Sequence, residues 1–195
     1  MGAGGHDGRR DAGVPRTARE KEPLPGDAGL TGTGREQAIR TGRRLRSLGV
    51  SALYSSPMRR ARETAEGIAS VTGLTVRCDA RSRERLNWDG SLPFDAFLDL
   101  WARTMRDRDW VPADGESSRQ AGTRLEESLS GLADTPGPVA AVTHGGVTVD
   151  LLRNLLGDDA VPAAVLAAGI PPCAVTAVDD LTVVMIASIS HLRRG

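Results

Sequence analysis

The sequence has little of what marks a secreted, zinc-binding or membrane protein. Its 195 residues include only two cysteines, Cys78 and Cys173, which lie far apart and outside any C-x-x-C pair. A disulfide framework or a zinc site therefore has no support, and a reducing cytoplasm fits. No apolar run approaches the roughly 18 residues of a membrane-spanning helix, and the N-terminus has no apolar signal-peptide core. We expect a cytoplasmic protein with no membrane partner.

An excess of charge of either sign is also missing. The formal net charge is +0 and the pI is about 6.8. Without a basic field, nothing draws the chain to nucleic acid or to an anionic surface, so a small local ligand is the better expectation. The length suits one domain that can bury its own core.

The chain divides by composition near Leu30. Residues 1–29 are rich in glycine, proline and charge and show no helical or strand period, so we expect an irregular or disordered segment. The domain should span residues 30–195. A helix capped by Thr31 or Thr33 and ended by Gly49 opens it.

Strands and helices alternate after that first helix. An apolar run over residues 50–54, a helix over 57–72 and a strand at 74–76 predict a βαβ unit, hence a parallel sheet. Farther along we expect a helix that is capped within residues 115–118 and runs to about Ala133, a strand at 139–142, a helix at 147–156 and a hairpin from 174–178 and 183–189.

All three tryptophans and both phenylalanines fall within one region, residues 86–118. Buried aromatics usually only pack, so a helical subcore at the sheet edge is the plain interpretation. A lid over a ligand is the alternative.

Three places at predicted strand ends carry chemistry, because ligands of open parallel sheets bind outside the carboxyl ends of strands. At Ser55 to Ala65, hydroxyls and a helix N-terminus with Arg59 and Arg60 would suit a phosphate; the alternative is a solvated arginine-rich face.

The other two places hold a histidine and a carboxylate. His144, followed by Gly145 and Gly146, could donate to a phosphoryl oxygen, or it could be structural. Glu84, between two arginines, could serve as a proton donor, although a surface ion pair would give the same pattern.

Five places along the chain resemble, in the same order, the landmarks of the histidine phosphatase (phosphoglycerate mutase-like) superfamily. They are LTGTGREQA from Leu30, SSPMRRARETA from Ser55, Glu84, GES from Gly115 and VTHGG from Val142. The resemblance implies a three-layer α/β/α fold with a mostly parallel central sheet. It also implies a metal-independent phosphatase that needs no cofactor and acts on a small organic phosphate monoester.

In such proteins a histidine attacks phosphorus and becomes a phosphohistidine. The resemblance puts Arg60, His144 and Gly145 at the phosphate, with His144 also catalytic, and makes Glu84 the acid for the leaving oxygen. Substrate identity, the choice between phosphatase and phosphomutase, and the oligomeric state, for instance a homodimer, are left open.

The chain departs from the family at its start. The Arg-His-Gly motif that follows the family's central strand is replaced by GAGGHDG, so only His6 can be proposed as nucleophile. Glycines bury little and weaken strands, so the central strand looks missing or degenerate. An incomplete N-terminus, an impaired member that only binds phosphate, and an active enzyme with an unusual N-terminus are the three explanations.

Overall fold

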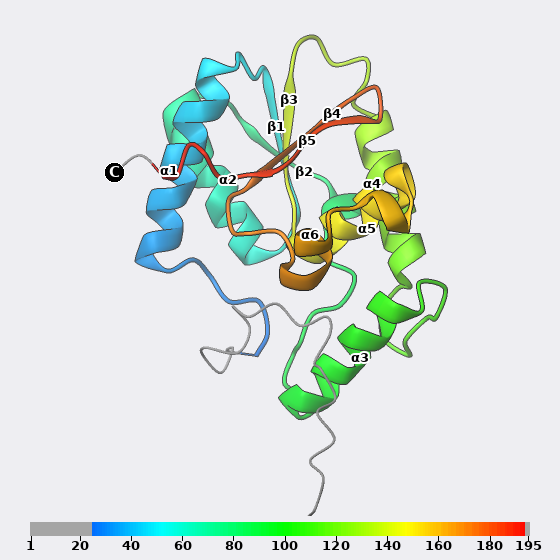
Figure 1. Ribbon diagram of the computed structural model, residues 1–195. Helices are drawn as coiled ribbons and strands as arrows, with labels where there is room; N and C mark the ends of the chain where they lie inside the picture. Colours follow the sequence, from blue (N-terminus) through cyan, green and yellow to red (C-terminus); the bar gives the residue numbers. More distant parts are fainter. Residues whose placement is uncertain (1–24, 194–195) are drawn as a thin grey trace, which may run out of the picture.

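The computed structural model describes residues 25–193, which form an α/β fold around a parallel sheet (Figure 1). Its helices are α1 (Gly32–Ser47), α2 (Arg59–Thr72), α3 (Phe94–Arg106), α4 (Ser118–Ser130), α5 (Gly145–Leu156) and α6 (Ala163–Ala168), with 3₁₀ turns η2 (Ala80–Ser82) and η3 (Asp158–Ala160). Its strands are β1 (Ala52–Ser55), β2 (Val76–Cys78), β3 (Val139–Val142), β4 (Val175–Asp179) and β5 (Thr182–Ser188). The α1–α2 pair lies on one side of the sheet, and α4–α5 lie on the other.

The three sheet strands run parallel in the order β2-β1-β3, as the βαβ pattern predicted. β1 and β3 are direct neighbours, with Leu53 opposite Ala140, so no strand lies between them. Within residues 25–193, β3 pairs with β1 alone, and all four of its residues are half-buried. The predicted hairpin forms as the antiparallel pair β4–β5, a separate two-stranded sheet.

The helices α1 and α2 pack through small residues. Thr31 caps α1 by accepting the backbone N–H of Gly34 at 3.1 Å. A Cβ on Gly42 would lie 3.0 Å from the Cα of Ile68, and one on Gly67 would lie 2.8 Å from the Cβ of Ala38. This close approach holds α2, which carries Arg60, tightly against α1.

The other side is built around buried arginines as well as apolar side chains. α4 and α5 pack through a cluster of Ala121, Leu125, Val147 and Leu151. Beside it, Arg85, Arg108 and Arg153 are at most 7% exposed. Each buried guanidinium contacts a carboxylate, the minimum needed to keep an ionised group inside a protein.

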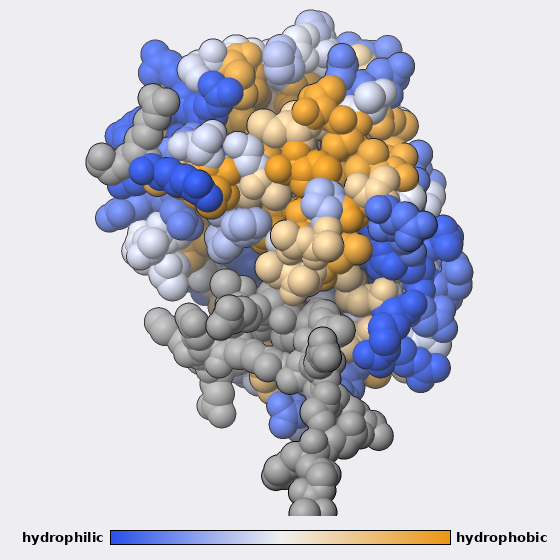
Figure 2. Space-filling model, in the orientation of Figure 1, coloured by the Kyte–Doolittle hydropathy of each residue, from blue (hydrophilic) through white to orange (hydrophobic). Residues whose placement is uncertain are grey.

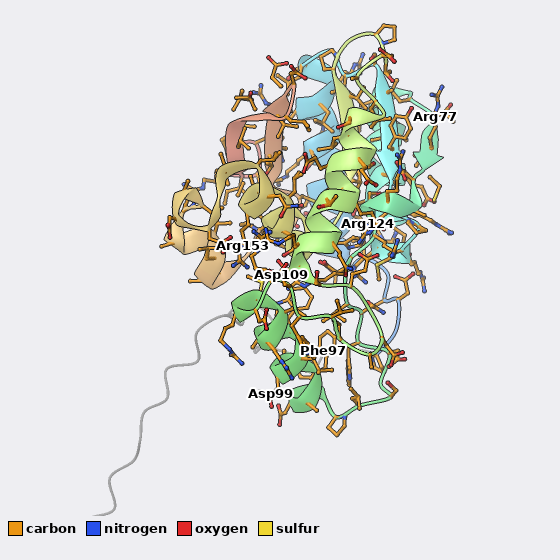
Figure 3. All side chains as sticks on the ribbon, turned by 90° about the vertical axis from the view of Figure 1, so that its right-hand side faces the viewer. Arg77, Phe97, Asp99, Asp109, Arg124 and Arg153 are labelled. Atoms are coloured by element: carbon orange, nitrogen blue, oxygen red, sulfur yellow. The ribbon has the colours of Figure 1, made fainter. Side chains whose placement is uncertain are left out.

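The aromatic region forms α3, which projects beyond the sheet toward one end of the molecule (Figure 3). Its rings make a row of contacts from Trp88 to Phe94, Phe97 and Trp101, with centroids 5.0 to 6.3 Å apart. Phe97 lies on α3, far from Arg77 at the opposite end. In residues 25–193 no helix is both long and apolar enough to cross a membrane.

Candidate functional site

The three chemically distinctive places predicted from the sequence meet at one edge of the sheet. β1 leads to Ser55–Ser56 and α2, β2 leads through η2 to Glu84, and β3 leads to His144 and α5. Because parallel strands end at the same edge, their following residues converge there. Of the predicted site residues within the described chain, Arg60 and His144 touch directly, and Glu84 lies beside them.

Arg60 lies in the first turn of α2. It points across the opening of the site between Arg60, Glu84 and His144, which we call the mouth. Its Nε donates to Nδ1 of His144 at 3.2 Å, and its Nη1 donates to Oδ1 of Asn87 at 3.2 Å. Partial burial lowers the pKa of Arg60, and the carboxylates of Glu84 and Asp27 act in the opposite direction. The guanidinium remains charged, because even a lowered arginine pKa stays far above neutral pH. It therefore presents a fixed positive fork to the mouth.

His144 is the N-cap residue of α5 and is 8% exposed. Burial, with the positive charges of Arg60 and Arg124, lowers the pKa of His144 to about 3, so the ring is neutral at pH 7. Since Nδ1 accepts from Arg60, the proton resides on Nε2. Nε2 donates to Oγ of Ser56, 2.8 Å away. A dianion at the mouth would favour protonation of this ring.

The carboxylate of Glu84 contacts the first turn of α5, where backbone N–H groups and the helix dipole favour an anion. Its Oε2 accepts the N–H of Gly146 at 2.9 Å, and its Oε1 accepts the N–H of Arg85 at 3.0 Å. A Cβ on Gly146 would lie 2.7 Å from Oε1, so only glycine leaves room for the carboxylate. α5 begins at Gly145, earlier than the predicted Val147, so both glycines form its first turn.

A second carboxylate reaches the mouth from residues 25–30. Oδ2 of Asp27 accepts the N–H of Arg59 at 2.6 Å, and its Oδ1 lies 3.7 Å from Nη1 of Arg60. Met58, the N-cap residue of α2, makes no side-chain cap, so Asp27 supplies one from outside the helix. Asp27 thereby helps to hold the Arg60 end of α2.

Behind Glu84, the next residue turns inward. The guanidinium of Arg85 is fully buried and pairs with Asp150, which also accepts from Ser118 at 2.6 Å. Nε of Arg85 donates to Thr104 at 3.1 Å, and the ring of Trp101 stacks 4.1 Å from its guanidinium carbon. This network fixes the backbone on which Glu84 sits.

Some members of the site were missed from the sequence. Ser56 was noted only as a strand-end hydroxyl, yet it holds the imidazole of His144. Trp101 was noted only as one of the aromatic residues of region 86–118, and Asn87 gave no signal, because an isolated amide carries no spacing pattern. Gly145, predicted at the phosphate, begins α5, and His6 lies outside the described residues.

Within residues 25–193 no three His, Cys, Asp or Glu side chains are grouped so as to hold a metal ion.

Comparison with known proteins finds relatives by sequence and by fold. Probable phosphoglycerate mutase GpmB of Citrobacter koseri is 31% identical over 142 residues, 67% of this chain and 65% of the relative. The match thus spans slightly less than two thirds of that relative's length.

Two solved structures share the fold. YhfR of Bacillus stearothermophilus is 26% identical with a TM-score of 0.68, covering 93% of this chain and 96% of its own. A mycobacterial glucosyl-3-phosphoglycerate phosphatase, solved with inorganic phosphate, is 27% identical with a TM-score of 0.64, covering 85% and 84%. The sequence model of the histidine phosphatase superfamily (branch 1) matches residues 18–180, and the chain belongs to that superfamily.

Proposed function

We propose that the protein is a metal-independent phosphatase that hydrolyses a small organic phosphate monoester through a phosphohistidine. The observation that carries this proposal is the direct contact of Arg60 with His144, beside a carboxylate at the N-terminus of α5. A fixed guanidinium and an imidazole suit the equatorial oxygens of a transferring phosphoryl group. Relatives named as a phosphatase and a probable mutase support the reaction class.

The reaction has two steps. In the first, a histidine nitrogen attacks phosphorus, the ester P–O bond breaks, and protonated Glu84 gives its proton to the leaving oxygen. In the second, Glu84, now a carboxylate, takes a proton from water as that water attacks phosphorus and the P–N bond breaks. The nucleophile in this proposal is His6, chosen from the sequence alone.

Arg60 and His144 would bind and stabilise the phosphoryl oxygens in both steps. The neutral His144 of the free site would take up a proton as the dianion arrives, since a neighbouring negative charge raises a histidine pKa. Gly145, in the first turn of α5, would let the phosphate approach backbone N–H groups closely.

The decisive experiment is hydrolysis of an aryl phosphate in EDTA by the wild type and by Arg60→Ala. We expect the variant to lose about 10² to 10³-fold in kcat/KM, as for other removed transition-state donors. Arg59→Ala is the matched control, because Arg59 is adjacent but exposed and paired with Glu63. Equal rates for the two variants would show that Arg60 does not bind the phosphoryl group.

The nucleophile needs its own test. Rapid alkaline quench of a reaction with labelled substrate should trap an alkali-stable, acid-labile phosphoenzyme that is absent from His6→Ala. Full activity in His6→Ala would remove His6 from the mechanism without touching the roles of Arg60 and Glu84.

The second candidate is an impaired family member that only binds phosphate. It is favoured by the glycine-rich residues around His6, which do not suit a buried strand. In that case phosphate or vanadate would raise the melting temperature while turnover is absent.

Phosphomutase activity would be distinguished from phosphatase activity by transfer of the phosphate from one position of the substrate to another. A cytoplasmic location, supported by the unpaired Cys78 and Cys173, and a homodimer belong to the proposal too.

A further inference from the structure

An apolar cavity of about 160 Å³ lies next to the mouth, between α3, the start of α5, and α6 with the segment after it. None of the residues that line it is charged. The side chains that shape it are those of Trp101, Met105, Val149, Val165, Leu166 and Ile170, and Gly145 and Gly146 complete its wall. The reaction as proposed makes no use of this space.

The cavity and the mouth share a wall. Gly146 lines the cavity and also donates its N–H to Glu84. A Cβ on Gly146 would collide with both the Trp101 ring and the Glu84 carboxylate. Trp101, Gly146 and Glu84 are therefore neighbours, and the cavity lies directly beside the Glu84 carboxylate.

The size of the cavity limits what it can hold. An apolar protein cavity of about 150 Å³ accommodates benzene, whereas whole drug-sized ligands need about 300 Å³ or more. The space therefore fits one ring or one branched alkyl group. A carboxylate or sugar hydroxyl placed there would lose water without gaining a charged partner from the lining.

The surroundings of the cavity are apolar too. Figure 2 shows apolar residues gathered over α6 and the β4–β5 hairpin, the side of the molecule that contributes Leu166 and Ile170 to the cavity. Val184 on β5 is 62% exposed on the same hairpin.

We infer that the cavity is the leaving-group subsite, and that the substrate is a phosphate monoester whose organic part is an aryl, arylmethyl or branched alkyl group. This inference rests on the proposed function, because Glu84 orients the leaving oxygen only if the phosphoryl group lies at Arg60 and His144. Trp101 then determines specificity by forming one face of the subsite.

Binding of three phosphonates tests the subsite without turnover. Methylphosphonate probes the mouth alone, benzylphosphonate adds a phenyl ring, and phosphonoacetate adds a charged group of smaller size. By calorimetry we expect benzylphosphonate to bind about tenfold more tightly than methylphosphonate, from burial of the ring. Phosphonoacetate should bind no more tightly than methylphosphonate.

Variants locate the gain in affinity. Leu166→Asn should bring the ratio of the two affinities close to one, because it puts an amide in the lining. Val165→Thr, which nearly preserves shape, should reduce the ratio about threefold and covers the case in which Leu166→Asn does not fold. Val184→Asn, exposed and outside the cavity, should keep the tenfold ratio.

The outcomes separate this inference from the proposed function. If methylphosphonate binds and the phenyl ring adds nothing, or if phosphonoacetate equals benzylphosphonate, the apolar subsite is wrong and the phosphate mouth stands. If neither inorganic phosphate nor any phosphonate binds, the proposed function fails and the subsite fails with it. A gain that survives Leu166→Asn and Val165→Thr would place the ring elsewhere.

Discussion

The two sides of the sheet are held together by different physics. The α1–α2 side relies on small residues and apolar packing, with Leu45, Leu53, Ala65 and Ile68 in its core. The α4–α5 side buries ionised groups, including the Arg85–Asp150 pair, each fully buried. Arg60 comes from the first side and Glu84 from the second, whereas His144 precedes α5 but its ring hydrogen-bonds to Arg60 and Ser56. The comparison shows that helix packing holds the end of α2 that carries Arg60, whereas a buried polar network around Arg85 and Asp150 holds the backbone next to Glu84.

Breaking the polar network should have the largest effect. Asp150→Ala leaves the guanidinium of Arg85 buried and unpaired, which should lower the free energy of unfolding by about 3 to 5 kcal/mol in urea denaturation. Asp109→Ala, at the exposed Arg119–Asp109 pair, should cost no more than about 1 kcal/mol.

A double variant sharpens this prediction. Arg85→Met with Asp150→Leu removes both charges and should recover much of the loss, because two apolar groups no longer need each other. If the double variant is as unstable as Asp150→Ala alone, the pair matters through shape and not through charge.

The next largest effect is expected at Gly146, in the first turn of α5. Gly146→Ala should displace the Glu84 carboxylate, because the new Cβ would lie within 2.8 Å of both of its oxygens. We expect kcat to fall about 10²-fold, the scale of a misplaced general acid, with phosphate binding retained. Glu84→Gln should behave alike. A Gly146→Ala enzyme with normal kcat would argue against Glu84 as the acid.

The sequence predicted the fold well because the periodic patterns are local. The βαβ unit, the hairpin and the two helix caps follow from adjacent residues, and each forms: of the two threonines predicted for the first cap it is Thr31, and within residues 115–118 it is Ser117. The strand-end rule then brought Arg60 and His144 together. The long-range partners of the charged residues could not be predicted. The sequence around Arg85 is typical of a surface ion pair, but Arg85 is buried and pairs with Asp150, 65 positions away. Neither the low pKa of His144 nor the cavity beside it has a sequence signal.

On the α1–α2 side we expect a smaller loss of stability, caused only by a steric clash between the two helices. Gly42→Ala would put a Cβ 3.0 Å from the backbone of Ile68 in α2, so the helices must separate. We expect a loss of about 2 kcal/mol in thermal or urea unfolding, against a helix-propensity gain of about 1 kcal/mol. Gly32→Ala, in the same helix with open space around it, should be neutral or stabilising. Equal effects would mean that the α1–α2 contact is not tight.

The smallest effect concerns His144, which lies on the boundary between the sides. Its pKa of about 3 in the free site must rise when a dianion binds, so binding takes up a proton. Affinity should then increase as the pH falls from the bound pKa toward the free one.

Sulfate is the probe for this linkage, because it stays dianionic from pH 7 to pH 5 while phosphate does not. Affinity should rise by up to about tenfold between these pH values, about 1.4 kcal/mol for each pH unit over which the bound ring is protonated and the free ring is neutral. His144→Asn should bind more weakly and lose the pH dependence, whereas Arg60→Ala should bind weakly but keep part of it. A flat profile in the wild type would mean that His144 stays neutral beside the anion, which would then depend on Arg60 for its positive charge.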